Sequence, residues 1–218
     1  PDPDQLELHR SDTPQTPFRI LAVASGATAT VSGLSMSGGE VGAEPRGVPG
    51  SATSPGNGGG IRNDGTLTLR RCAVRNNRAY AGYTPTAPRQ GLSRPGSGGG
   101  IYSRGELIIE DCEITGNQTI IGDGGGIHAI GPLTVRNSLI AGNNADGRIN
   151  KIPYAVQDSK GGGIRSEALL TMTNSTVTGN QVSGSGGGIA SSGAVNLSHT
   201  TVSGNRFYKV GLLGSGGG

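Results

Sequence analysis

The feature that most constrains the fold is a glycine triplet followed by isoleucine, which occurs five times. The copies lie at 58–61, 98–101, 124–127, 161–164 and 186–189, and successive isoleucines are 40, 26, 37 and 25 residues apart. Glycine and proline contribute 42 and 12 of the 218 residues, a composition that by itself would suggest disorder. A fixed apolar repeat argues against disorder and indicates stacked structural units.

Each unit carries apolar residues in alternation, as in the Leu67–Leu69 stretch. This period of two is typical of strands with one buried face. The shortest unit is too short for a propeller blade, which needs about 40 residues. We therefore predict an all-β, right-handed, single-stranded parallel β-helix of about six to seven coils, with two or three short strands per coil. An isoleucine opens and an asparagine closes each unit: Ile61, Ile101, Ile127, Ile164 and Ile189, then Asn77, Asn117, Asn143, Asn180 and Asn205.

The repeat also assigns roles to its polar and flexible positions. Asparagine tolerates left-handed backbone and bonds stacked neighbours, so the closing residues predict a structural ladder at one corner. Residues 1–57 are expected to form irregular N-terminal coils, and 58–218 the regular coils of the same domain, truncated at the C-terminus. Within the first segment, Val31, Leu34 and Met36 align with the later apolar columns, and Gly39 replaces the asparagine.

The two cysteines, Cys72 and Cys112, occupy the same inward column of neighbouring coils. Stacked neighbours lie close enough for a disulfide, but parallel side chains rarely reach its torsion, so buried free thiols are favoured over a bond. No histidine or carboxylate shares that column, and no phosphate-binding loop follows a triplet, so we expect neither a metal nor a cofactor.

The GGGI triplet, the Gly-x-Leu-x-Leu strand and the (Cys/Ser)-x-(Val/Ile)-x-x-Asn ending resemble right-handed parallel β-helix surface proteins. The similarity is to polymorphic outer-membrane-protein-type repeats and pectin-lyase-like solenoids, and it covers roughly 18–218. The chain departs from the first type in having Val or Ile where that family usually has phenylalanine. The resemblance implies the β-helix fold and a bacterial protein located extracellularly or on the outer cell surface.

All length variation falls between the closing asparagine and the next triplet, in five inserts that should emerge along one edge of the solenoid. The inserts are 78–97, 118–123, 144–160, 181–185 and 206–215. They carry five of the seven aromatic residues and eight basic residues against three acidic ones. Tyrosine and arginine are typical of interfaces, although the rings could simply pin the inserts to the coils. The binding residues predicted on this edge are Tyr80, Tyr83, Arg89, Lys151, Tyr154 and Lys160.

These features favour an acidic glycan or a protein as the partner. The net charge of +3 does not indicate nucleic acid, and no apolar run reaches the length of a membrane span, so no membrane insertion is expected within this segment. Open solenoid ends also permit end-to-end self-association.

Few side chains of the sequence are candidates for catalytic residues. Glu110 and Asp111 are predicted to pair with basic or amide neighbours of adjacent coils, and His128, without a nucleophile beside it, is expected to be an exposed surface residue. We therefore favour a non-enzymatic secreted or cell-surface β-helix acting as adhesin, stalk or interaction scaffold. The alternatives are a polysaccharide lyase or hydrolase of the pectin-lyase-like type, and a self-assembling filament or surface-layer component. The acids of the enzyme alternative would be Asp123, Asp146 and Asp158.

Overall fold

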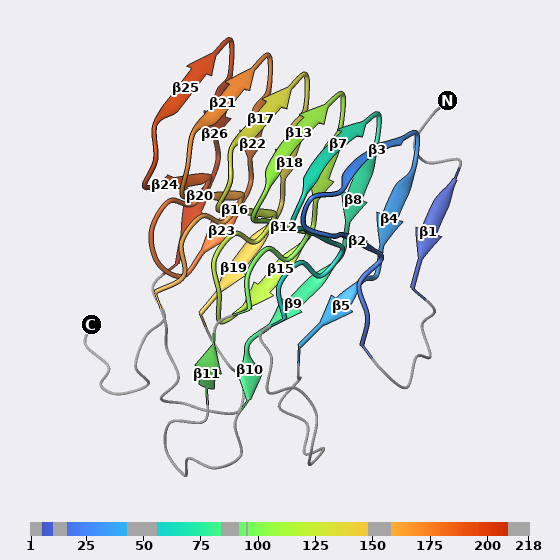
Figure 1. Cartoon of the computed structure of the whole chain (residues 1–218). Helices are drawn as coiled ribbons and strands as arrows, with labels where there is room; N and C mark the ends of the chain where they lie inside the picture. Colours follow the sequence, from blue (N-terminus) through green and yellow to red (C-terminus); the bar gives the residue numbers. More distant parts are fainter. Residues whose placement is uncertain are drawn as a thin grey trace, which may run out of the picture.

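The computed structural model describes residues 6–10, 17–42, 56–83, 92–94, 96–147 and 158–208. This part of the chain consists of short strands and contains no helix. Successive turns of the chain stack on one another, so that four parallel sheets run along the molecule (Figure 1). The prediction of an all-β parallel β-helix is confirmed.

Each coil contains four strands joined by short corners. In one coil these are β6 (Ile61–Asn63), β7 (Thr66–Arg70), β8 (Ala73–Arg75) and β9 (Arg78–Tyr80). The other strands, in chain order, are β1 (Glu7–His9), β2 (Leu21–Val23), β3 (Thr28–Ser32), β4 (Ser35–Ser37), β5 (Glu40–Val41), β10 (Gly82–Tyr83), β11 (Leu92–Arg94), β12 (Ile101–Ser103), β13 (Glu106–Glu110), β14 (Glu113–Thr115), β15 (Gln118–Ile120), β16 (Ile127–Ala129), β17 (Leu133–Arg136), β18 (Leu139–Ala141), β19 (Asn144–Asp146), β20 (Ile164–Ser166), β21 (Leu170–Thr173), β22 (Thr176–Thr178), β23 (Gln181–Val182), β24 (Ile189–Ser191), β25 (Val195–Ser198), β26 (Thr201–Ser203) and β27 (Arg206–Phe207).

We number the sheets by their order within a coil. The first sheet is β2-β6-β12-β16-β20-β24, the second β3-β7-β13-β17-β21-β25, the third β1-β4-β8-β14-β18-β22-β26 and the fourth β5-β9-β15-β19-β23-β27. Ile109 pairs with Leu69 on one side and Val135 on the other, as the repeat alignment requires. The described residues thus form six coils, with β1 adding a strand to the third sheet, in agreement with the predicted number.

The expectation of two or three strands per coil was wrong, because the fourth sheet was assigned to the inserts. β9, β15 and β19 lie within the segments 78–97, 118–123 and 144–160. Each of these strands buries one small inward side chain, such as Ala79 or Ala145. A single small residue carries no alternating apolar signal, so the strands were not recognisable from the sequence.

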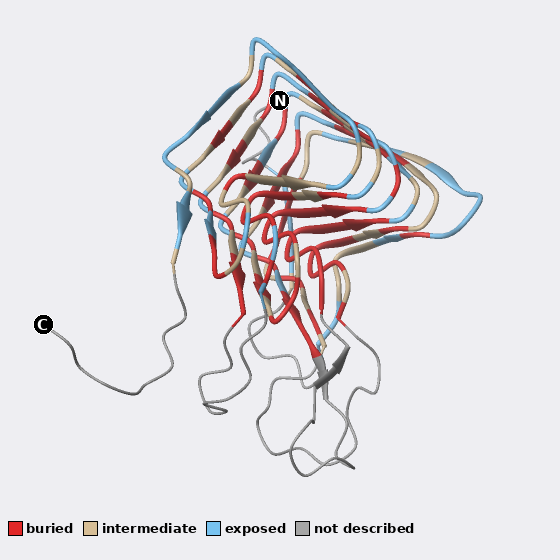
Figure 2. Ribbon diagram, turned by 90° about the vertical axis from the view of Figure 1, so that its left-hand side faces the viewer, coloured by how far each residue is buried: buried red, intermediate tan, exposed pale blue. Residues whose placement is uncertain are grey.

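The core is a narrow stack of aliphatic side chains enclosed by the coils. Figure 2 shows buried residues along the strands and exposed ones at the outer corners. Leu67, Leu107 and Ile109 have no accessible surface, whereas Val195 and Leu197 in the last described coil are 41% and 46% exposed. Burial is therefore strongest in the central coils.

The predicted asparagine ladder is present and fully hydrogen-bonded. Asn117 Oδ1 accepts both the backbone N–H and the side-chain Nδ2 of Asn77, each at 3.0 Å. Asn117 Nδ2 donates to Val74 O at 2.9 Å and to Asn143 Oδ1 at 3.0 Å. The same pattern continues to Asn180 and Asn205, and at the other end Gly39 N donates to Asn77 Oδ1 at 2.8 Å. Each amide from Asn77 to Asn180 thus ties its coil to both neighbours, and Asn205 ties the last described coil to the one before it.

Each glycine of a triplet is required for a different reason, as residues 98–100 illustrate. Gly98 has a φ of +67°, which L side chains rarely adopt. A Cβ on Gly99 would lie 2.4 Å from the backbone oxygen of Gly125, and one on Gly100 would lie 2.8 Å from Asn117 Cγ. The triplet therefore lets the chain turn against the next coil and against the asparagine ladder.

Candidate functional site

In the chain, each variable segment begins with or after a fourth-sheet strand and ends before the next glycine triplet. The described residues that flank them are hydrogen-bonded from coil to coil at this edge. Gly56 N donates to Tyr80 O, and Gly96 N donates to Ile121 O, both at 3.1 Å. We call this boundary the insert edge. Its flanking residues stack in register, as the repeat alignment predicts.

The residues predicted to bind a partner differ in their placement on the insert edge. Tyr80 lies in β9 and is only 3% exposed, while Lys160 is exposed and its backbone N–H donates to Asp123 Oδ1 at 2.8 Å. Tyr83 ends β10, which pairs antiparallel with β11. Arg89, Lys151 and Tyr154 lie outside the described residues. The binding role of this set remains a prediction.

The candidate loop acids also differ in their surroundings. Asp146 is buried in β19, with 9% of its surface exposed, and Asp158 is exposed. Asp123 is held by the Lys160 backbone and lies 3.9 Å from Arg165 Nε. Asp146 thus differs from the two other acids in being buried.

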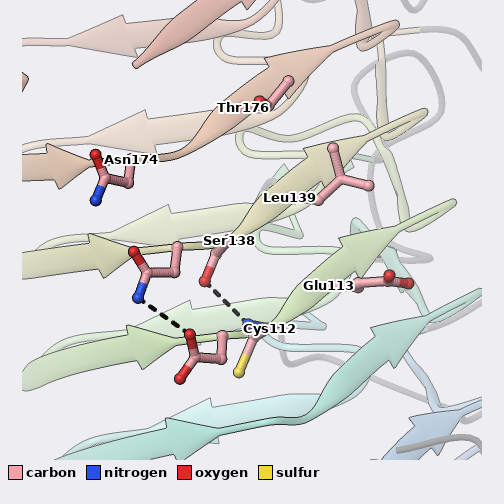
Figure 3. A pocket seen from close by; sticks show the side chains of 8 residues that line it. Cys112, Glu113, Ser138, Leu139, Asn174 and Thr176 are labelled. Atoms are coloured by element: carbon pink, nitrogen blue, oxygen red, sulfur yellow. Dashed lines mark hydrogen bonds between the residues drawn. The ribbon is translucent and has the colours of Figure 1, made fainter. Parts of the chain in front are cut away.

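A second surface feature is a hollow of about 510 Å³ at the corner between the second and third sheets. We call it the corner trough. Three successive coils contribute to it, and Figure 3 shows Glu113, Leu139 and Thr176 on successive strands of the third sheet. Its lining residues are Asp111, Cys112, Glu113, Asn137, Ser138, Leu139, Asn174 and Thr176.

The corner trough owes its shape to a column of left-handed residues. Asp111, Asn137 and Asn174 have φ values of 54°, 49° and 49°, a conformation that Asn and Asp adopt more readily than other L-residues. Beneath them, Cys112 N donates to Ser138 Oγ at 3.0 Å, and Ser138 Oγ donates to Arg136 O at 2.6 Å. This second ladder fixes the backbone of the corner.

The rim of the corner trough is polar and acidic. Asn137 Nδ2 donates to Asp111 Oδ1 at 3.1 Å, and Glu113 and Asn174 are exposed. Just outside it, Glu110 lies 3.0 Å from Arg70 Nε and 3.1 Å from an Arg136 nitrogen. The predicted charge ladder is confirmed, and the lining residues themselves include two carboxylates and no basic side chain.

The expectation that His128 is an exposed surface residue was wrong. His128 is only 7% exposed, and its Nε2 lies 3.0 Å from Glu167 Oε1. The Tyr102 ring meets the imidazole edge-on, with 5.5 Å between centroids. Arg165 lies within 3.9 Å of both Asp123 and Glu167. We call these five residues, on the outer side of the first sheet, the His128 cluster.

Burial governs the electrostatics of this cluster. It lowers the pKa of His128, although hydrogen bonding to Glu167 acts in the opposite direction. The neutral imidazole therefore carries its proton on Nε2, facing the carboxylate, and Nδ1 has no hydrogen-bond partner within the described part of the chain. Burial also raises the pKa of Tyr102 and lowers that of the nearby Arg19. Because Nδ1 is buried, no solute reaches it in this arrangement.

Cys72 and Cys112 are free and buried, as favoured from the sequence. Cys72 N donates to Cys112 Sγ at 3.3 Å, so the thiols occupy the same ladder as Ser138. The pKa of Cys112 lies above its usual range, because its hydrogen bond with Cys72 and its burial both favour the protonated form. The cysteines thus serve as corner residues.

Within the described ranges, no cluster of three or more His, Cys, Asp or Glu side chains has the arrangement of a metal site. The same ranges contain no helix long and apolar enough for a membrane crossing.

The fold and register define the chain as an all-β parallel solenoid protein. No protein-family model matches the chain, no curated protein is significantly similar to it, and no solved structure matches it. The resemblance to β-helix surface proteins therefore rests on the repeat residues alone.

Two arrangements escaped the sequence reasoning. The His128 cluster joins residues of different columns, since Glu167 lies one coil on and two positions beyond Arg165, the paired partner of His128. A search along diagonals of the repeat alignment would have found it. The corner trough was signalled by the polar column of Asp111, Asn137 and Asn174, which precedes the Cys/Ser column.

Proposed function

We propose that the chain is a non-enzymatic interaction scaffold, an adhesin or stalk of the secreted or cell-surface β-helix type. Its contact surface is the insert edge, and its partner is an acidic glycan or a protein. In scaffolds of this kind, the repeat provides a rigid fold, and the variable segments between the repeats make the contacts with a partner.

The proposal rests on the described residues of the insert edge, which flank the variable segments and stack from coil to coil. Three of the six described coils are followed at this boundary by segments with described residues on both sides, namely 43–55, 84–91 and 148–157. The sequence places a surplus of basic side chains in these segments, including Arg89, Arg148 and Lys151. Their positive charge favours an anionic partner.

Replacing residues 84–95 and 148–157 by short Gly-Ser links tests the proposal. These boundaries spare β9 and β19, which the sequence-based insert limits would have removed. Wild-type protein should bind immobilised polygalacturonate or heparin, and salt should weaken that binding. The shortened protein should keep its circular dichroism spectrum and lose the binding.

Arg104→Ser provides the control, because it removes one exposed positive charge from another surface. It should leave binding to both polysaccharides intact. Equal affinity of the wild-type and shortened proteins would place the contact elsewhere and refute the assignment of the insert edge.

A polysaccharide-active enzyme is the second candidate, and one observation favours it. Glu167 orients the imidazole of His128, which leaves Nδ1 as the unprotonated nitrogen. Nδ1 is buried, so it acts as a general base only after the neighbouring side chains move to admit a sugar. Incubation with acidic polysaccharides should then yield new reducing ends or unsaturated products. His128→Gln should abolish them, whereas a scaffold yields none with either protein.

A further inference from the structure

The corner trough lies at a different corner of the coil from the insert edge, and the proposed function leaves it unused. We infer that the corner trough binds a linear, neutral glycan, whose chain runs along the solenoid axis with one sugar unit facing each coil. The inference is independent of any partner at the insert edge.

The first argument is the repeat of the lining residues along the axis. Each of three successive coils contributes one corner side chain and one strand side chain, separated by a single residue. The pairs recur at the strand spacing, about 4.8 Å, close to the length of one sugar unit in an extended glycan. A ligand that repeats at this spacing can make an equivalent contact on every coil. The pairs are Asp111 with Glu113, Asn137 with Leu139, and Asn174 with Thr176.

The second argument is hydrogen-bonding chemistry. A sugar hydroxyl both donates and accepts, so it requires side chains of both kinds. The carboxylates of Asp111 and Glu113 accept, while the amide of Asn174 and the hydroxyl of Thr176 do both. Leu139, which is half-buried, offers an apolar contact for the C–H face of a sugar ring.

The third argument is preorganisation. The corner backbone is held by the Cys112–Ser138 hydrogen bond below, and the Asn137 amide is already oriented by Asp111. Groups fixed before binding lose little entropy when a ligand arrives. A weakly bound sugar chain therefore benefits from contacts repeated on three coils.

The fourth argument is charge. Two exposed carboxylates with no basic residue among the lining side chains disfavour uronates, phosphates and nucleic acid. The corner trough and the basic inserts thus select for ligands of different charge.

The test is calorimetric titration with cello-, manno- and xylo-oligosaccharides of increasing length. At least one series should bind, with affinity rising to the trisaccharide and then levelling off, because three coils line the trough. Thr176→Arg should weaken binding about tenfold or more by filling the trough. Thr178→Arg lies on the same face of β22, two residues further on and outside the lining, and should leave affinity unchanged.

The variant with shortened inserts separates this inference from the proposed function. It should retain oligosaccharide binding even where it loses acidic polysaccharides. Failure of all three series to bind the wild-type protein overturns the inference. So does an equal effect of the two threonine substitutions in variants that keep the wild-type circular dichroism spectrum, or loss of binding on insert shortening.

Discussion

At the scale of single residues, the asparagine that closes each coil satisfies backbone groups of its own coil and of its neighbours. Asn143 Oδ1 accepts the backbone N–H and the Nδ2 of Asn117, each at 3.0 Å. Its own Nδ2 donates to Ile114 O at 2.8 Å and to Asn180 Oδ1 at 2.9 Å. All of these groups are buried, so each depends on the ladder for its hydrogen bond.

Asn143→Ala should therefore lower the free energy of unfolding by about 2–4 kcal/mol, since several buried groups lose their partners. Chemical denaturation monitored by circular dichroism measures the loss. Asn205→Ala is the matched comparison and should cost less, because Asn205 is half-buried and ends the described ladder. Equal costs for the two substitutions would contradict the ladder's dependence on burial.

The protonation of His128 makes the stability of the fold depend on pH. Burial holds its folded-state pKa below the usual 6.5, at which it titrates in the unfolded chain. Asp123 and Glu167 face the imidazole and favour protonation, while Arg165 opposes it. As pH falls through 6.5, the unfolded chain takes up a proton that the folded protein does not. The contribution of the neutral His128 to the free energy of unfolding is therefore fully present above pH 6.5 and is lost as the pH falls below it.

The melting temperature should thus fall between neutral pH and about pH 5, and fall less in His128→Gln, which lacks the titrating group. Parallel pH profiles for the two proteins would show that His128 is not the group responsible.

At the scale of elements, the repeat alignment predicted the strands that bury two or more aliphatic side chains. Leu67 with Leu69, and Leu107 with Ile109, identify β7 and β13 by their alternation. The fourth sheet was missed because its inward residues are as small as Ala79, and the burial of His128 was missed because it depends on side chains of neighbouring coils. The apolar period is thus readable within a single repeat, whereas a contact such as His128–Glu167 becomes visible only when different columns of neighbouring repeats are compared.

The glycine triplet offers a test of coil stacking. Gly99→Ala should cost more than about 3 kcal/mol or prevent folding, because its Cβ would meet backbone atoms of Gly125 and Gln118 within 2.5 Å. Gly142→Ala, at a φ of +62° with no atom within 4 Å of the added Cβ, should cost only the left-handed strain of about 1–2 kcal/mol. Thermal denaturation of both variants measures the two costs. Similar melting temperatures would mean that the coils are not in the close contact described.

At the scale of the whole molecule, the described strands of each coil pair only with strands of the coils before and after it, so stability is expected to vary along the axis. β17 has a paired strand on both sides, whereas β25 is paired only with β21 among the described strands. Hydrogen exchange should therefore be slow in β13 and β17 and faster in β25. Uniform protection across these three strands would instead indicate a single cooperative unit.

The parallel stacking of coils also has a mechanical consequence. The hydrogen bonds between coils run along the solenoid axis, so tension applied between the two ends of the chain loads them a coil at a time. Each detached coil frees the chain stored in one repeat, between 25 and 40 residues. If the chain is the cell-surface stalk proposed above, it would lengthen in steps under shear and recover its length by rewinding onto the coils that remain.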